Sequence, residues 1–305
     1  MLLLLKYTLI SAIVLMLVAL GGMFSERSGI INIALEGIMV MGALAGIIAL
    51  NVLPSGTSSF VIITVSVLAS AIIGGIYSAL LGFASINLKA DQTIGGTALN
   101  LLATAVAMVI VKNFNGSQSS KLNYNNSPFL FNIGGLSLNV FVVIGLVILV
   151  VSYIVLYKTK FGLRLMACGE HPQAADSVGI NVYKMRWAGV IISGMLGGLG
   201  GFAYVVPAVK TWNFEVGVSG MGFLALAVMI FGQWKPHRIF FAAVFFAVFK
   251  SLANISDSTI LANLGWSSNI YDMMPFIASM VILAFTSKKS RAPKAEGIPY
   301  DKGQR

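Results

Sequence analysis

One carboxylate, Glu36, lies well inside a long apolar stretch of the chain, where an ionisable group is costly and normally faces a cavity or a partner. Asn32 precedes it by one expected helical turn, and Asn100 lies in another apolar stretch. These side chains could contact a polar solute, and Glu36 could relay an ion or a proton. Equally, Glu36 could pair with Arg27 or with a backbone end, and Asn100 could join two helices. The pattern leaves both interpretations open.

The motifs of common catalytic centres are missing from the sequence. It contains no Gly-x-x-x-x-Gly-Lys-[Ser/Thr] phosphate loop, no His-Glu-x-x-His and no pair of aspartates within the apolar stretches. The single cysteine, Cys168, excludes an internal disulfide and a cysteine-based metal cluster. His171 and His237 lack the spacing of zinc ligands. We therefore expect no catalytic residue, no cofactor and no metal site.

Composition places the chain in the membrane rather than in water. Hydrophobic residues make up 57% of its 305 residues and charged residues only 10%, against roughly 25% charged in ordinary soluble domains. The net charge of +10 could suggest nucleic acid. However, the Lys and Arg residues fall in short connections and in the tail, and they form no basic helix face. We therefore expect lipid, and not nucleic acid, around this protein.

Nine apolar runs are long enough to position these side chains across a hydrocarbon core, which takes around 20 residues per helix. Backbone groups in lipid must be satisfied internally, and barrel-type alternation is absent, so we predict helices. The sequence thus predicts an all-α integral membrane protein with about nine transmembrane helices (eight to ten) within residues 1–287, followed by a polar, disordered tail at 288–305. The runs are Leu4–Phe24, Ile30–Val52, Phe60–Ile86, Gln92–Val111, Leu138–Tyr157, Trp187–Val206, Val216–Gln233, Ile239–Asn254 and Tyr271–Thr286.

Loop charge predicts the orientation of these helices. Most of the 20 Lys and Arg residues fall on alternate connections and in the tail, and the basic side of a membrane protein is usually cytoplasmic. We therefore expect an outside N-terminus, a cytoplasmic C-terminus, an external loop at 113–137 and a cytoplasmic loop at 158–186.

The 158–186 loop carries the signals of a short capped helix. Pro172 suits the first helical position, and Gly179 suits a left-handed residue just past the end. A helix of under two turns is not stable alone and needs a surface on which to dock. Either it is a connector packed on the protein's own face, or it docks a cytoplasmic partner.

Small residues predict close helix contacts and a faint internal repeat. Gly194 with Gly198 and Gly197 with Gly201 form small-xxx-small pairs, which let neighbouring helices pack closely. Close packing alone accounts for these glycines, and a flexible hinge at a gate is the alternative. Ser28-Gly29 and Ser219-Gly220 precede similar Ile-Ala-Leu and Leu-Ala-Leu triplets at equal spacing. This echo suggests a 4+4 inverted repeat around the fifth helix, as in many transporters.

The loop resembles the coupling loop of ATP-binding-cassette importer permeases of the branched-chain amino acid, ribose and nucleoside superfamily. The resemblance rests on Phe161, Gly162, Ala167, Gly169, Ala174, Ala175, Gly179 and Ile180. The stretch from Phe24 to Gly37, with Gly222-Phe223 and Gly232-Gln233-Trp234-Lys235-Pro236, is similar to the nucleoside and simple-sugar branch. This likeness runs over most of the chain, from about Gly21 to Thr286.

The resemblance implies a type II importer-like permease and its partners. These are a cytoplasmic ATPase, an extracytoplasmic substrate-binding lipoprotein and a second permease, usually a different chain. It implies that Gly169, Glu170, Pro172, Ala174, Ala175 and Gly179 contact the ATPase. The expected cargo is a small polar solute, a nucleoside first, then a simple sugar or a flavin precursor, passing Asn32, Glu36 and Asn100. The alternative is a stand-alone secondary transporter that uses Glu36 as an ion or proton relay.

Overall fold

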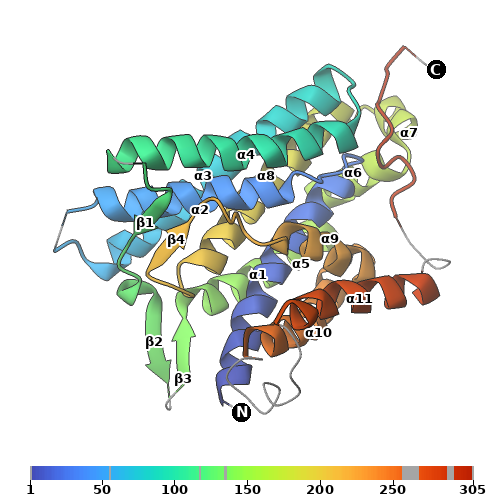
Figure 1. Cartoon of the computed structure of the whole chain (residues 1–305). Coiled ribbons are helices and arrows are strands. Elements are labelled where there is room, and N and C mark those ends of the chain that lie inside the picture. The colour runs from blue at the N-terminus through green and yellow to red at the C-terminus, as the bar shows by residue number, and fades with distance from the viewer. Residues whose placement is uncertain are drawn as a thin grey trace.

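The computed structural model describes residues 2–54, 56–116, 118–133, 136–255, 268–286 and 292–303 of the chain. Figure 1 shows a helical protein with two small two-stranded sheets. The elements are α1 (Leu2–Glu26), α2 (Leu35–Val52), α3 (Ser59–Gly82), a π-helical turn (Phe83–Asn87), α4 (Gln92–Asn115), β1 (Lys121–Asn123), a 3-10 turn (Ser127–Phe129), β2 (Leu130–Ile133), β3 (Leu136–Asn139), α5 (Val140–Lys158), α6 (Lys160–Glu170), α7 (Pro172–Ser177), α8 (Val182–Val205), β4 (Thr211–Asn213), α9 (Met221–Phe231), α10 (Pro236–Ile255) and α11 (Ser268–Thr286).

Each of the nine predicted apolar runs contains a helix. Within the described ranges, 7 helices are long and apolar enough to cross a membrane, namely α1 to α5, α8 and α10. The shorter α9 spans 11 residues, and α11 spans 19. A count of about nine helices therefore agrees with the structure, and the chain is a multi-pass membrane protein.

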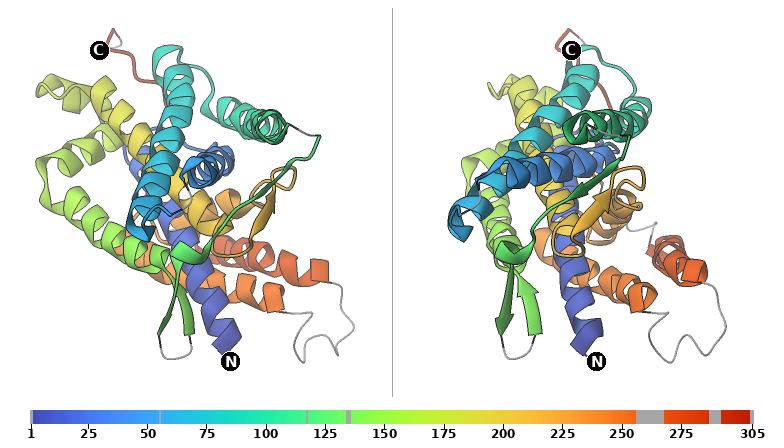
Figure 2. Two further views of the ribbon diagram at one scale, coloured as in Figure 1. Left: turned by 90° about the vertical axis from the view of Figure 1, so that its left-hand side faces the viewer. Right: turned by 60° about the vertical axis from the view of Figure 1, so that its left-hand side comes forward.

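The connections gather at two opposite ends of the helices. The N-terminus lies at the end with the strands, and α6, α7 and the C-terminus lie at the other, in every view (Figures 1 and 2). We call these the strand end and the α7 end. β1 pairs antiparallel with β4, with Leu122 opposite Trp212, and β2 pairs antiparallel with β3. The predicted external loop 113–137 thus contains ordered strands at the strand end.

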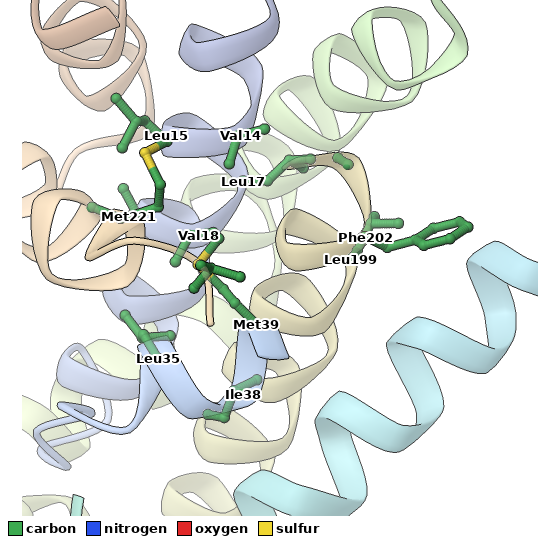
Figure 3. Packing of buried hydrophobic residues seen from close by; sticks show 14 of the residues in the cluster. Val14, Leu15, Leu17, Val18, Leu35, Ile38, Met39, Leu199, Phe202 and Met221 are labelled. Carbon is green, nitrogen blue, oxygen red and sulfur yellow. The ribbon is translucent and has the colours of Figure 1, made fainter. Parts of the chain in front are cut away.

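The core lies where α1, α2, α8 and α9 meet. Leu15 and Val18 of α1, Met39 of α2 and Phe202 of α8 are fully buried. Figure 3 shows Val18 and Met39 close together in the middle of this region, whereas the Phe202 ring points away from them on the other side of α8. By contrast, α3, α4 and α5 expose rows of Val, Leu and Ile side chains. Apolar side chains can remain exposed only where lipid or a partner replaces water, so these helices form the outer surface of the bundle.

Two sequence predictions are corrected by the fold. The second apolar run was expected to be helical from Ile30, but α2 begins only at Leu35. The tail was expected to be disordered, but residues 292–303 lie on the α7 end in a defined conformation with buried Ala295 and Tyr300. The prediction of disorder rested on the polar composition of the tail. It was wrong because main-chain hydrogen bonds and one buried aromatic side chain hold this segment in place. Residues 287–291 and 304–305 of the tail lie outside the described ranges.

Candidate functional site

A short capped helix stands at the α7 end, as predicted. α7 begins at Pro172 and ends at Ser177. Gly179 has a φ of 84°, and the Ile180 N–H donates to the Ala175 carbonyl at 3.0 Å. A left-handed glycine with this returning bond is the usual way to close a helix. The sequence did not predict α6, the longer helix directly before it.

The predicted coupling residues divide into an inner and an outer set. Gly169, Pro172 and Ala175 are buried within the protein, so in this conformation they fix the loop rather than meet a partner. Ala174 and Gly179 are exposed, and the Glu170 side chain is 40% exposed. Val178 was missed and is 74% exposed. Its signal in the sequence was an apolar residue directly before the closing glycine of a polar loop.

The inner set packs against the turn that follows α1. A Cβ at Gly169 would collide with the Arg27 carbonyl oxygen, so only glycine allows this approach. The Arg27 guanidinium lies 3.8 Å from the Glu170 carboxylate. An ion pair with one exposed partner stabilises little, so the close backbone packing is the firmer link between α6 and α1.

Two stretches that are far apart in the sequence meet at this end of the protein. Arg27 donates to the Trp234 carbonyl from Nε at 3.3 Å and from Nη2 at 3.1 Å. The Trp234 indole N–H donates to the Glu26 carboxylate at 2.5 Å. Trp234 adopts a φ of 53°, which is uncommon for a bulky residue. The Glu26-Arg27 pair and the Gln233-Trp234 turn therefore form one structural unit with the coupling loop.

Glu36 caps a helix inside the bundle. Its Oε1 accepts the Gly220 N–H and its Oε2 accepts the Gly222 N–H, both at 2.7 Å. These groups belong to the N-terminus of α9, where free N–H groups and the helix dipole favour a negative charge. The sequence left open whether Glu36 faces a solute or pairs with Arg27 or a backbone end, and in this structure it contacts a backbone end. Arg27 does not pair with it, because its guanidinium binds the Trp234 carbonyl.

Asn100 and Asn32 support the same helix break. Asn100 of α4 accepts the Gly37 N–H at 2.8 Å and donates to the Ile33 carbonyl at 2.9 Å. Asn32 is fully buried and donates to the Ser193 hydroxyl at 2.8 Å, while its Oδ1 has no partner. The prediction that Asn32 and Glu36 lie one helical turn apart is wrong, because Asn32 precedes α2. The N-termini of α2 and α9 meet where these side chains converge.

The four predicted packing glycines lie on two faces of α8. Gly194 and Gly198 face α3, where added Cβ atoms would collide with Ser78 and with the Ser70 carbonyl. Gly197 and Gly201 face Ile38 and Met39 of α2. α8 can therefore touch both neighbours at backbone distance only because these positions lack side chains.

Ionisable chemistry outside the membrane-spanning segments is sparse. Burial raises the pKa of the Cys168 thiol to about 11, so the thiol stays protonated and unreactive at neutral pH. Burial also raises the pKa of Glu296, which sits in hydrogen-bonding contact with the Glu26 carboxyl group. In the part of the chain that the structure describes, no three His, Cys, Asp or Glu residues are grouped to hold a metal.

Several named proteins are similar to this sequence over most of its length. It is 38% identical over 303 residues to the nucleoside ABC transporter permease protein NupC of Lactococcus lactis, covering 95% of this chain and 94% of that protein. It is 38% identical over 310 residues to the guanosine ABC transporter permease protein NupQ of Bacillus subtilis, covering 98% and 96%. A putative glucose ABC transporter permease, TsgC13 of Haloferax volcanii, is 32% identical over 273 residues, covering 85% and 79%. No solved structure matches.

A family model decides between the two classes of transporter considered above. Residues 4–284 match the model of the branched-chain amino acid transport system permease component. The relatives are permeases of ABC transporters, so the prediction of a transport subunit rather than an enzyme is confirmed. The matched description, a permease component of a transport system, and the ABC transporter relatives favour the importer subunit over a stand-alone secondary transporter. From its helices, its α7 end and this match over nearly its full length, the chain belongs to the branched-chain amino acid transport permease family.

Proposed function

We propose that this chain is the permease of an ATP-driven nucleoside importer, and that α7 is its docking element for the ATPase. The observation that supports the proposal is the exposed α7 tip, formed by Ala174 of α7 and by Val178 and Gly179 directly after it, on a base of buried residues. A rigidly held helix with a small, partly apolar exposed face suits insertion into a groove of a partner. The inner residues then carry movement of the tip to α1.

The proposed orientation places the α7 end in the cytoplasm and the N-terminus outside. Most Lys and Arg residues lie on the connections of this end and in the tail, and basic connections favour the cytoplasmic side. The ordered loop with β1 to β4 then faces outward, where an extracytoplasmic substrate-binding lipoprotein delivers cargo. The exposed apolar faces of the outer helices leave room for a second permease chain, which we expect to differ from this one.

A nucleoside is the proposed cargo, and a simple sugar is the second choice. Two relatives at 38% identity are named for nucleosides or guanosine, and one at 32% is named for glucose. We propose that Asn32, Glu36 and Asn100 border the route, because discontinuous helices with converging N-termini form the polar sites of many transporters. In that case their present hydrogen bonds must open or bend as the protein changes state.

The experiment is ATP-dependent uptake of labelled guanosine and ribose into vesicles that contain this chain with its co-expressed neighbouring subunits. Ala174→Arg adds a large charge to the exposed face of α7, and we expect it to abolish ATP-dependent uptake. The control is Gln118→Arg, which adds the same charge at an exposed position of the strand end, away from α7, and should preserve transport. Uptake that persists in Ala174→Arg, or that needs no ATPase, would contradict the proposed coupling.

A further inference from the structure

The C-terminal segment crosses the coupling loop and the turn after α1. We call residues 292–303 the C-terminal strap. The Ala295 N–H donates to the Gly169 carbonyl at 2.8 Å, and the Gly297 N–H donates to the Gly29 carbonyl at 3.2 Å. Two main-chain bonds, only two residues apart in the strap, thus join the end of α6 to the beginning of the α1–α2 connection.

An aromatic side chain anchors the strap in a small apolar core of its own. Tyr300 is 4% exposed and packs with Cys168, Ala175 and Val182, which come from α6, α7 and α8. Its ring also meets the Tyr183 ring edge-on, with centroids 5.3 Å apart. Ala175 is the buried residue at the base of the exposed α7 tip. Tyr300 therefore supports the coupling helix directly from beneath.

Charged contacts extend the strap to two further elements. Arg186 of α8 is almost fully buried and donates to the Ile298 carbonyl at 3.0 Å. Asp301 forms an exposed ion pair with Lys89, between α3 and α4, at 2.8 Å. The strap thus also contacts α8 and the connection between α3 and α4.

The coupling loop needs such a support. α7 has only six residues and cannot hold its shape alone. Besides the backbone packing of Gly169 against Arg27, its link to the α1 turn is the 3.8 Å ion pair between Arg27 and the half-exposed Glu170, a kind of contact that contributes little. If the loop were loose, a pull on α7 would shift the loop and leave the transmembrane helices in place.

We propose that the C-terminal strap makes α6 and α7 move as one body with the α1–α2 turn and α8, so that movement of the ATPase reaches the transmembrane helices. Tyr300 is then a positioning residue for energy coupling. The inference rests on the proposed docking of the ATPase at α7. Packed side chains, hydrogen bonds and rigid elements of this kind carry coupling between distant sites in proteins.

The test compares ATP hydrolysis with guanosine uptake in the reconstituted importer, made with the full permease chain, its ATPase, the second permease and the binding protein. We expect Tyr300→Ala to raise the ATP hydrolysed per guanosine imported by about 3- to 10-fold, with hydrolysis itself retained. Ile298→Ala is the matched control, because the Ile298 side chain is 57% exposed and only its carbonyl is used. A purely structural defect lowers both rates together and leaves the ratio unchanged.

Cys168 reports whether the strap has left its site, because it is the only cysteine in the chain and lies beneath Tyr300. We expect N-ethylmaleimide to modify Cys168 faster in Tyr300→Ala, as measured by mass spectrometry of its peptide. If Cys168 stays protected, the strap is still in place, and a variant that lacks residues 292–303 is tested instead of Tyr300→Ala. The ATP hydrolysed per guanosine imported is measured for that variant in the same way. An unchanged ratio with the strap released overturns the proposal.

The Ala174→Arg variant separates the two proposals. If Ala174→Arg abolishes coupling while release of the strap leaves the ratio unchanged, the strap proposal alone fails. If Ala174→Arg leaves uptake and hydrolysis intact, the docking role of α7 fails first.

Discussion

At the scale of single residues, the same kind of side chain does different work at different depths. Asp91 and Glu36 both accept backbone N–H groups at the start of a helix. Asp91 is exposed, and water can replace it. Glu36 lies inside the bundle and its hydrogen bonds are partly buried, so water replaces it less readily at the N–H groups of α9. The cost of losing a cap therefore depends on what else can reach it.

Replacement of Glu36 by alanine tests this difference. We expect Glu36→Ala to lower the free energy of unfolding by about 2 kcal/mol, because two partly buried N–H groups lose a charged acceptor. Asp91→Ala is the control and should cost about 1 kcal/mol, as exposed helix caps do. The melting temperature of each variant in detergent, followed by circular dichroism, measures both. Equal losses would mean that Glu36 is not a buried cap.

The buried carboxyl group of Glu296 should make the docking of the strap depend on pH. Its pKa is raised first by burial, whereas contact with Glu26 and the charge of Arg27 lower it. A carboxyl group with a raised pKa binds its proton more tightly in the docked state, so docking is favoured at low pH and weakens as the pH rises through that value. We expect hydrogen exchange in residues 292–303 to increase from about pH 5 to about pH 8, relative to intrinsic rates.

The control for this effect is Glu296→Gln, which resembles the protonated acid. Exchange in the strap of this variant should remain slow over the same range. Glu26 on α1, Arg27 in the following turn and the Trp234 indole, which donates to Glu26, are unchanged in it. If both proteins show the same pH profile, another group controls the docking.

At the scale of elements, α8 packs closely against its neighbours because glycines at the contact positions carry no side chain. Gly198 faces Gly42 of α2 and both Ser70 and Gly74 of α3, at distances that leave no room for a Cβ. Three helices therefore meet at one backbone position. Dispersion contacts are lost steeply with separation, so any outward shift of α8 weakens both interfaces at once.

Gly198→Ala should destabilise the protein although alanine favours helices. We expect a loss of about 1–3 kcal/mol, because overpacking forces the backbones apart. Gly95→Ala is the matched control in α4, where an added Cβ would meet only Leu81 at 4.0 Å. That change should leave the melting temperature equal or slightly higher. A neutral Gly198→Ala would show that the contact can relax.

At the scale of the whole molecule, the two ends of the bundle have different characters. The strand end is built from paired segments of two connections, with Asn123 opposite Thr211. The α7 end is built from a turn, two helices and the strap. An importer receives cargo on one side and energy on the other, so this difference is what the proposed orientation requires.

Orientation can be read directly with cysteines introduced into a Cys168→Ser protein. A membrane-impermeant maleimide added to intact cells should modify Gln118→Cys, which is exposed at the strand end, and spare Gln173→Cys, which is exposed on α7. Opened cells should show modification of both, which controls for intrinsic reactivity. The reverse pattern in intact cells would place α7 outside and remove the proposed ATPase contact.

Local rules were sufficient for the long apolar helices and for α7, although not for α6, the start of α2 or the short strands. Nine runs of apolar residues predicted nine helices, because a backbone in lipid must satisfy its own hydrogen bonds. Pro172 and Gly179 predicted α7, because proline and glycine act on the backbone of their own turn. Resemblance over the loop predicted the family for the same reason, since a motif is read along the chain.

Contacts between distant segments decided the rest. The start of α2 at Leu35 depends on Asn100 and Ser193, which bind the preceding segment from other helices. Glu36 became a cap only because α9 begins beside it, and the order of the strap depends on Gly169 and Gly29. Such partners are far apart in sequence and polar in character, so neither composition nor periodicity contains them. Only the tertiary structure determines which buried hydrogen-bond donor lies next to which acceptor.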